Sequence, residues 1–587
     1  MEPVCRHGNH CCLAGGDHIH RIAKIHYQRS HDRSRKRLNT LRAVRSTALI
    51  FSMKKLITLF LLTSILIGCT PATPTTLPPT PEPDPAQEAT AAPETEPAAW
   101  WRDAVFYEIF VRSFQDSDGD GIGDFNGIVQ RLDYIQELGA NALWLMPIHP
   151  SPSYHGYDVL NYYAVNPEYG TMDDFRKLLT EAHERGIRVI IDLVLNHTSS
   201  QHPFFVDANR DVNSPYRDWY IWSNETGNYW HQGNGGNYYG FFWGGMPDLN
   251  YRNPEVTAQM EEVTRYWLED IGVDGFRIDA AKHLIEEGAK IENTEATHEW
   301  FKEFYTFYKS IEPDAYTVGE VYGAGAFLAT KYAGQTDHIF NFELASGFVN
   351  SVAGESNTGI NGAWAFTLKD ISNGNYATFL TNHDQNRVIS VLNGNEQKAK
   401  LAAVLLLTSP GTPFIYYGEE IGMQGRKPDE DIRLPMQWNA DVNAGFTTGT
   451  PWRMPDASYT QVNVAAQEKD PGSLLNLYRM LTRLRAEHPV LRDGNLTVLE
   501  TGNSGVYAIL RHSDSEDVLI LINLKGTPIF EYSLGLPDAI LADGTHTVTS
   551  LLDTTQANNL NITGGMFTGY RPLAELHPYQ AYIFKLK

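Results

Sequence analysis

Residues 273–279 read Val-Asp-Gly-Phe-Arg-Ile-Asp, a short apolar run that ends in a cation and a carboxylate. Residues two apart in a strand point to the same face, so Arg277 and Asp279 are expected to lie side by side. If the run is a strand of a parallel barrel, both groups lie at its C-terminal mouth, where such barrels carry their active sites. An arginine neighbour favours the ionised, nucleophilic form of an aspartate. Taken alone, the pair is more typical of a structural ion pair.

Outward from this run, short apolar segments alternate with amphipathic stretches, which indicates parallel strands linked by helices. Thr171 and Asp174 have the spacing of a capping box, so one helix is expected at 173–185. Strand-like runs lie at 105–111, 142–146, 189–195, 275–279, 316–320, 338–342, 376–382 and 413–417. Eight such alternations predict a (β/α)8 barrel.

Two parts of the chain depart from this alternation. About fifty residues rich in Tyr, Trp, Asn and Gly separate the third strand from a helix expected near Pro254, and long irregular segments in compact domains are usually functional. After a last barrel helix at 474–487, alternating runs at 506–511, 518–523 and 581–586 predict a small antiparallel β domain.

The N-terminal region has the features of an export signal. Met53 and two lysines precede an apolar run at 56–67, which leads into Leu-Ile-Gly-Cys69 and resembles a bacterial lipobox. A membrane span is the alternative, but the run is well short of the ~20 residues that a spanning helix needs. We therefore expect a signal peptide at 53–69 with a lipidated Cys69, an exported protein anchored to the bacterial cell envelope, and a non-native upstream extension at 1–52. Residues 70–99, rich in Thr, Pro, Glu and Ala, are expected to be a disordered linker.

Charge and cysteine content narrow the functional classes. The formal net charge is −23, although residues 1–52 hold ten Lys or Arg against three Asp or Glu, so the rest of the chain is the acidic part. A surface this acidic argues against nucleic acid and anionic substrates, whereas neutral sugars are compatible with it. Nothing after Thr70 is cysteine, so the folded part contains no disulfide.

Four motifs fall at the expected strand ends. They are Asp192-Leu-Val-Leu-Asn196-His197, Gly275-Phe-Arg277-Ile-Asp279-Ala-Ala-Lys282-His283, Gly319-Glu320 and Phe379-Leu-Thr-Asn382-His383-Asp384. In type and order they resemble those of the α-amylase family of glycoside hydrolases, and the resemblance extends from Trp101 to Lys587. It implies a (β/α)8 TIM barrel at 100–197 and 254–490, an inserted domain B at 198–253, and a C-terminal antiparallel β-sandwich, domain C, at 491–587.

Three carboxylates are the predicted catalytic residues. Retaining cleavage of a glycosidic bond needs a nucleophilic carboxylate and a second carboxyl that first donates and then accepts a proton. Asp279, beside Arg277, suits the nucleophile. Glu320 has no basic neighbour in its motif, and nearby Asp279 and Asp384 would raise its pKa, so it suits the acid/base. The resemblance implies that Asp384 binds sugar hydroxyls and supports the distorted, oxocarbenium-like transition state.

Further substrate contacts are implied by the same resemblance. Tyr157 would stack on the reacting sugar, the histidines of two motifs would hydrogen-bond it, and Arg433 would pair with Asp158 near the end of the substrate, as in related α-glucosidases. An ordinary core aromatic is the alternative for Tyr157. The implied substrate-binding residues are Tyr157, Asp158, His197, Arg277, Lys282, His283, His383 and Arg433.

An acidic loop predicts a calcium (Ca²⁺) site. Aspartates alternate with glycines from 116 to 124, and glycines let a tight loop bring several hard oxygens onto one cation. An EF-hand would need Glu at its twelfth position, where Gly127 stands; a solvated acidic turn is the other alternative. The resemblance implies that Ile122 contributes its carbonyl, and that Asn196 and the His283 carbonyl belong to a second calcium site. The predicted ligands of the first site are Asp116, Asp118, Asp120, Ile122 and Asp124.

The motifs differ in the specificity that they indicate. Lys282-His283 is similar to α-amylases, whereas Pro435-Met-Gln-Trp438 is similar to oligo-1,6-glucosidases and trehalose-forming enzymes, and Met246-Pro-Asp-Leu-Asn250 resembles an intermediate oligo-1,6-glucosidase/neopullulanase group. We expect a monomeric, endo-acting α-amylase that cleaves α-1,4 bonds of starch-like glucans or maltooligosaccharides, with no nucleic-acid partner and a membrane contact only through the lipid anchor. The alternatives are an exo-acting α-glucosidase or oligo-1,6-glucosidase, a glucan transglycosylase, and an inactive glucan-binding relative, which the presence of all three carboxylates disfavours.

Overall fold

The structure, a computed structural model, describes residues 99–587 except 324–325 and 372–373. The predicted upstream extension, the signal with Cys69, and the linker up to residue 98 lie outside the described residues. Within the described part, no helix combines the length and the apolar character needed to cross a membrane.

Eight parallel strands form a (β/α)8 barrel, as predicted. A bridge between Phe340 and Ala377 joins the two edge strands and closes the barrel. The strands are shorter than the predicted runs at their C-terminal ends, because the chain there leaves the sheet as loops that carry the predicted site residues. The strands are β1 (Phe106–Ile109), β2 (Ala142–Leu145), β3 (Arg188–Leu193), β7 (Gly275–Ile278), β8 (Tyr316–Gly319), β9 (His338–Ile339), β10 (Ala377–Thr378) and β11 (Thr412–Tyr416).

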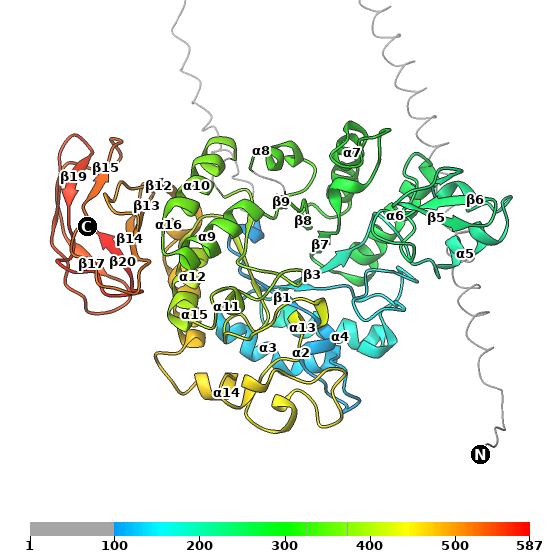
Figure 1. The fold of residues 1–587 in the computed structure, drawn as a ribbon, viewed down its shortest axis with the longest axis horizontal. Helices are drawn as coiled ribbons and strands as arrows, with labels where there is room; N and C mark the ends of the chain where they lie inside the picture. Colours follow the sequence, from blue (N-terminus) through cyan, green and yellow to red (C-terminus); the bar gives the residue numbers. More distant parts are fainter. Residues whose placement is uncertain (1–98, 324–325, 372–373) are drawn as a thin grey trace, which may run out of the picture. The chain divides into compact units, whose positions relative to one another are not determined.

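Helices surround these strands (Figure 1). The capping box that the sequence predicts is present, because Thr171 Oγ1 accepts a hydrogen bond from the Asp174 N–H and the Asp174 carboxylate accepts one from the Thr171 N–H. The longer helices are α3 (Phe125–Leu138), α4 (Met172–Glu184), α6 (Pro254–Arg265), α7 (Glu295–Ile311), α9 (Phe342–Gly354), α10 (Thr358–Asp370), α12 (Glu396–Thr408) and α15 (Leu474–Glu487). The shorter ones are α2 (Val111–Phe114), α5 (Pro203–Arg210), α8 (Ala326–Ala329), α11 (Val388–Val391), α13 (Asp429–Ile432), α14 (Val464–Gln467) and α16 (Val490–Asp493).

Large apolar side chains fill the barrel. Phe106 and Phe414 stack with ring centroids 4.3 Å apart, and Trp144 packs against both Phe340 and Phe414. Full burial of each such side chain stabilises the fold by roughly 1.5–3 kcal/mol. Gly275 opens β7 because a Cβ there would lie 2.7 Å from the backbone nitrogen of Tyr316 and would clash with its carbonyl. The core thus holds β7 tightly against β8 just below the site.

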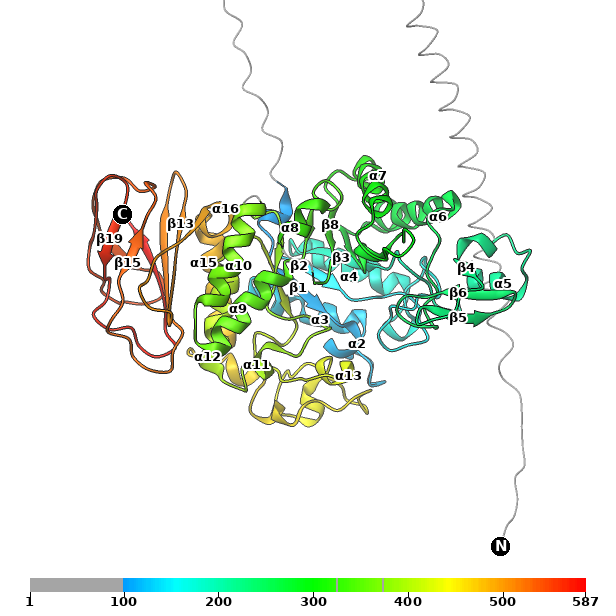
Figure 2. The same ribbon diagram turned by 45° about the horizontal axis from the view of Figure 1, so that its top comes forward.

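The segment between β3 and α6 forms a small subdomain with α5 and a three-stranded sheet of β4 (Trp222–Ser223), β5 (Trp230–Gly233) and β6 (Gly236–Tyr239). The C-terminal part is antiparallel, as predicted, with a five-stranded sheet and two strand pairs (Figure 2). This part encloses a common apolar core between these strands. Its strands are β12 (Asn495–Val498), β13 (Val506–His512), β14 (Asp517–Asn523), β15 (Leu534–Leu536), β16 (Gly544–His546), β17 (Val548–Ser550), β18 (Leu560–Ile562), β19 (Phe567–Tyr570) and β20 (Ala581–Leu586).

Candidate active site

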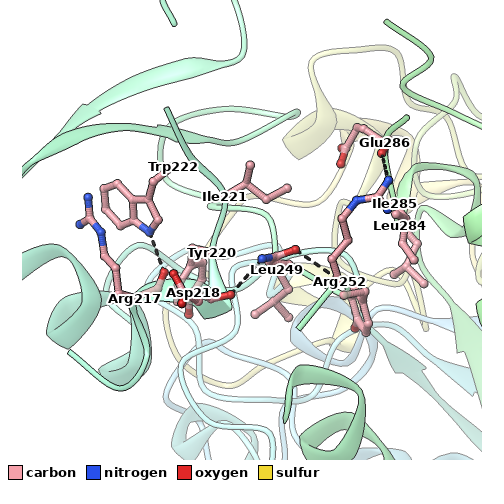
Figure 3. Close-up of a pocket in the computed structure, with 12 residues that line it drawn as sticks. Arg217, Asp218, Tyr220, Ile221, Trp222, Leu249, Arg252, Leu284, Ile285 and Glu286 are labelled. Atoms are coloured by element: carbon pink, nitrogen blue, oxygen red, sulfur yellow. Dashed lines mark hydrogen bonds between the residues drawn. The ribbon is translucent and has the colours of Figure 1, made fainter. Parts of the chain in front are cut away.

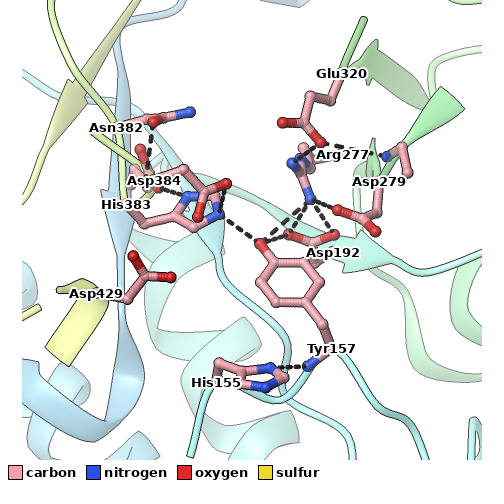
Figure 4. A network of polar contacts seen from close by, with 12 residues as sticks. His155, Tyr157, Asp192, Arg277, Asp279, Glu320, Asn382, His383, Asp384 and Asp429 are labelled. Carbon is pink, nitrogen blue, oxygen red and sulfur yellow. Dashed lines mark hydrogen bonds and ion pairs between the residues drawn. The ribbon is translucent and has the colours of Figure 1, made fainter. Parts of the chain in front are cut away.

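Arg277 is the centre of the site rather than one half of an ion pair (Figure 4). Its Nη1 lies 2.6 Å from Oδ1 of Asp279 and 2.9 Å from Oδ1 of Asp192, and its Nη2 lies 2.6 Å from Oε2 of Glu320. The arginine side chain is only 1% exposed. The ends of β3, β7 and β8 therefore bring three carboxyl groups onto one buried guanidinium.

The pKa values of the three carboxyls depend on burial and on the single positive charge that they share. Burial raises the pKa of Asp192 to about 7, with Arg277 opposing the rise and Asp279 adding to it. Burial also raises the pKa of Asp279, and Arg277 opposes the rise there too. One cation cannot neutralise three buried carboxylates, so the cluster favours keeping a proton near neutral pH.

Glu320 has the raised pKa that the sequence predicts. Burial is the main cause, Arg277 opposes it, and Asp279 and Asp384 add to it. Glu320 has no basic neighbour in its own motif, but β7 and β8 pair side by side and bring Arg277 to it. The raised pKa of Glu320 favours its protonated form, which is the form that can donate a proton.

Asp384 lies on the open side of the cluster with a 41% exposed side chain. Burial acts to raise the pKa of Asp384, but His383 and Arg433 outweigh it and hold the pKa well below its usual range. Its Oδ1 is 2.9 Å from Nη2 of Arg433, and its Oδ2 is 3.2 Å from Nε2 of His383. It is therefore an ionised hydrogen-bond acceptor on the open side of the cluster.

His383 is held by Glu108, a residue that the sequence reasoning missed. Its Nδ1 lies 2.6 Å from Oε1 of Glu108, and both side chains are almost fully buried. Burial would lower the pKa of His383, but the carboxylates of Asp384 and Glu108 raise it to about 9. The imidazolium therefore presents Nε2–H to the site, where Tyr157 lies 2.8 Å away.

Tyr157 joins the two halves of the cluster. Its hydroxyl donates to Oδ2 of Asp192 at 3.1 Å, and its ring lies parallel to that of His383, with centroids 5.7 Å apart. Tyr157 is partly exposed. Asp192 received no predicted role, because it lies inside its apolar run rather than at the end of it, where Asp279 lies in its own run.

The predicted pair of Arg433 and Asp158 is wrong. Arg433 contacts Asp384 and, at 3.3 Å, Asp429, while Asp158 accepts hydrogen bonds from Ser151 and Ser153. The serines of the loop after β2 satisfy Asp158 locally. The arginine is left to orient Asp384.

Lys282 and His283 follow Asp279 and lie beside Glu320. The Ala281 N–H donates to the Glu320 carbonyl at 3.1 Å, which brings the Lys282-His283 turn next to Glu320. Lys282 forms an ion pair of 2.6 Å with Glu292. His197 is fully buried, and burial lowers its pKa to about 4, so it is a neutral hydrogen-bonding group.

The acidic loop gathers part of the predicted calcium ligand set. Carboxylate oxygens of Asp116, Asp118 and Asp120 lie within 4.8 Å of one another. Asp124 instead caps α3 and accepts bonds from Gly127 N and Ser117 N. Clustered hard oxygens of this kind fit a calcium ion.

A second group of oxygens lies between the inserted subdomain and the barrel. Four buried oxygen atoms in this group have no hydrogen-bond partner among the described residues. They are Oδ1 of Asn196, the Tyr239 hydroxyl, Oδ2 of Asp248 and Oε1 of Glu286. Burial, and next the charge of Glu286, raise the pKa of Asp248. Asp248 and Glu286 thus supply carboxylates near Asn196 that the sequence did not assign.

Glu286 also borders a cavity of about 390 Å³ that contains none of the predicted catalytic residues (Figure 3). Its lining combines polar and apolar side chains, and Nη2 of Arg252 donates a 2.6 Å hydrogen bond to the Glu286 carbonyl. The cavity is lined by Arg217, Asp218, Tyr220, Ile221, Trp222, Leu249, Asn250, Tyr251, Arg252, Leu284, Ile285 and Glu286.

Comparison with known proteins agrees with this geometry. The chain is 45% identical over 436 residues to α-amylase 3 of Dictyoglomus thermophilum, covering 73% of this chain and 85% of that protein. It is 34% identical over 525 residues to a probable oligo-1,6-glucosidase of Bacillus subtilis, covering 74% and 92%. The crystal structure of an α-amylase from H. orenii superposes with a TM-score of 0.72 at 39% identity, covering 82% of this chain and 99% of that one.

The family model for the α-amylase catalytic domain matches residues 108–494, which hold all three predicted catalytic carboxylates. This match covers more than half of the chain, and the chain therefore belongs to the α-amylase family of glycoside hydrolases.

Proposed function

We propose that the protein is an endo-acting α-amylase that cleaves α-1,4-glucosidic bonds with retention of configuration. The observation that carries this proposal is the placement of Asp279 and Glu320 on the two ends of one guanidinium. A single guanidinium joining both carboxyls favours the short separation, ~5 Å, of a retaining pair over the wider gap of an inverting one.

Each group has a defined role in the proposed reaction. Glu320 protonates the leaving oxygen while Asp279 attacks C1 and forms the glycosyl-enzyme, and Glu320 then removes a proton from the incoming water. Asp384 accepts hydrogen bonds from sugar hydroxyls, and His383 donates from Nε2. Arg277 remains charged throughout and stabilises the carboxylates.

Product analysis distinguishes this proposal from its alternatives. An endo-acting enzyme cuts a maltooligosaccharide whose non-reducing end is blocked, whereas an exo-acting α-glucosidase leaves it intact and a transglycosylase makes longer products. Asp279→Asn should reduce cleavage of soluble starch by at least about a thousandfold, because it removes the nucleophile. Starch cleavage that survives this substitution would refute the mechanism.

Two calcium sites are proposed as structural supports. The first uses Asp116, Asp118 and Asp120, where glycines allow the tight loop. The second uses Asn196, Asp248 and Glu286, whose unpartnered buried oxygens would gain a cation as partner. Titration of the purified, chelator-treated enzyme with calcium, followed by calorimetry, tests both.

Export and lipid anchoring are proposed from the sequence around Cys69. A polymer too large to import favours an extracytoplasmic enzyme, and acylation would tether it through the linker. Mass spectrometry of the mature N-terminus in a bacterial host, with Cys69→Ala as the control, tests the proposal.

A further inference from the structure

Ala280, the residue directly after Asp279, has a left-handed backbone conformation. Its φ and ψ angles are 46° and 35°, a region in which residues with a Cβ are uncommon. The residue is buried. A left-handed alanine is unfavourable unless the surrounding structure holds it in place, and such residues concentrate at active sites. The contacts of Ala280 show what this conformation achieves.

The left-handed turn directs two successive amides at Glu320. The Ala280 N–H donates to Oε2 of Glu320 at 3.3 Å, and the Ala281 N–H donates to the carbonyl oxygen of Glu320 at 3.1 Å. Successive N–H groups converge on one acceptor group where left-handed and right-handed residues adjoin, and Ala281 opens a short helical turn that ends at His283. A right-handed Ala280 would rotate the chain that follows and break this convergence.

Strand pairing fixes the chain on the other side of Asp279. The Glu320 N–H donates to the Ile278 carbonyl at 2.9 Å, and the Asp279 N–H donates to the Leu193 carbonyl at 3.2 Å. Glu320 is thus bonded to the backbone both before and after Asp279. The relative position of the two carboxyl-bearing residues is therefore set by the backbone, and the left-handed residue provides the bonds on one side.

The two carboxyl oxygens of Glu320 have different surroundings. Oε2 accepts a 2.6 Å hydrogen bond from Nη2 of Arg277 in addition to the bond from Ala280. Among the residues that the structure describes, no donor reaches Oε1, and Figure 4 shows this oxygen turned away from Arg277. An oxygen that already faces two donors is a poor place for a further proton. Oε1 is therefore the oxygen that is better able to carry the proton of the acid.

We propose that Ala280 is a positioning residue for the acid/base: its left-handed conformation aims its amide at Oε2 of Glu320, and this bond directs the acidic proton to Oε1. The inference rests on the proposed glycoside hydrolysis. In the first step Oε1 gives its proton to the leaving oxygen, and the amide stabilises the carboxylate that results. In the second step Oε1 takes a proton from the attacking water, which restores the acid.

Replacement of Ala280 by lactic acid tests this amide without changing a side chain. The replacement exchanges the N–H for an ester oxygen, so Oε2 of Glu320 keeps its bond from Arg277 and loses only the backbone donor. The matched control is the same replacement at Ala281, which removes a bond to the Glu320 carbonyl and leaves both donors of the carboxyl in place. Ala280→Gly is the second control, because glycine keeps the N–H and adopts the left-handed conformation freely.

The measurement is the pH profile of kcat/KM on maltopentaose and on isomaltose, whose basic limb reports loss of the proton from the acid. In the Ala280 ester we expect the basic limb to move up by about half to one pH unit, because the ionised carboxyl loses a donor. We also expect kcat to fall about fivefold or more with little change in KM, because the carboxyl is no longer held in place. Both controls should keep the basic limb of the wild-type enzyme.

A shift of the limb reports the amide, because the charged groups that act on Glu320 are the same in every variant. These groups are Arg277, Asp279, His283, His383 and Asp384. An unchanged limb in the Ala280 ester, or an equal shift in either control, would overturn the inference. Cleavage of isomaltose but not of maltopentaose by the wild-type enzyme would instead refute the endo-acting function, and the limb on isomaltose would then decide the inference.

Discussion

Glu108→Gln tests whether the buried pair with His383 keeps that imidazole charged. The substitution preserves shape and removes one of the two carboxylates that raise the pKa of His383 from 6.5 to about 9. At 1.36 kcal/mol for each pKa unit, the whole shift corresponds to about 3 kcal/mol. Asp384 is the larger of the two contributions, so Glu108 supplies less than half of the shift, roughly 1 kcal/mol.

The sign of the effect follows from linkage. The folded-state pKa of His383 is raised, so its stabilisation is complete below pH 6.5 and is lost as the pH rises through about 9. Glu108→Gln should therefore destabilise the enzyme by roughly 1 kcal/mol more at pH 6 than at pH 10, which corresponds to roughly 1 °C in unfolding temperature for a chain of this size.

Differential scanning calorimetry at both pH values, with the calcium concentration fixed, measures the difference. Glu184→Gln is the control, because Glu184 is exposed on α4 and its loss should shift the unfolding temperature little at either pH. Equal destabilisation by Glu108→Gln at pH 6 and pH 10 would show that the carboxylate does not sustain the charge of His383.

Three further outcomes are expected. Chelation of calcium should lower the free energy of unfolding by about 2–3 kcal/mol at calcium levels near a hundred times Kd, and Asp116→Asn should lose part of that response in calorimetry. Arg511→Met should cost about 3 kcal/mol in denaturant unfolding, against little for the exposed Arg483→Met, because the buried guanidinium of Arg511 donates to four carbonyls at the junction of barrel and C-terminal sheet. Tyr157→Phe should lower kcat on α-maltosyl fluoride by about ten- to hundredfold while the ring stays in place, because Asp192 loses a charge-assisted donor; an unchanged kcat would exclude a role for the hydroxyl.

Local sequence patterns predicted most of the barrel. Each predicted run became a strand of the closed sheet, because its apolar residues suit burial on both faces and its loops follow directly. The C-terminal part was harder: β13, β14 and β20 have clear runs, whereas three-residue strands such as β15 and β16 are fixed by tertiary packing and leave no periodic signal.

The site was predictable only where a residue follows a recognisable strand end. Glu108 lies in β1 among apolar residues and acts on His383, 275 positions away, so no local motif marks it. The partner of Arg433 depended on loop geometry, since Asp158 and Asp384 both carry the required charge and the nearby serines decide which one is free. Spacing alone gives the type of each group but not its neighbour in space.

The groups that are neighbours of Arg277 in space determine the chemistry that the site can perform. As a pair, Arg277 and Asp279 balance in charge, and the aspartate would be expected to ionise freely. With Asp192 and Glu320 on the same guanidinium, the carboxylates outnumber the cation. One proton is therefore retained most favourably on the buried carboxyl whose negative charge the cation neutralises least. Arginine suits this position better than lysine, because its planar fork presents separate donors to the separate carboxyls at once. One cation thereby meets the opposing demands on a nucleophile and an acid: Arg277 favours the ionised form of Asp279, but it cannot ionise all of the neighbouring carboxyls as well.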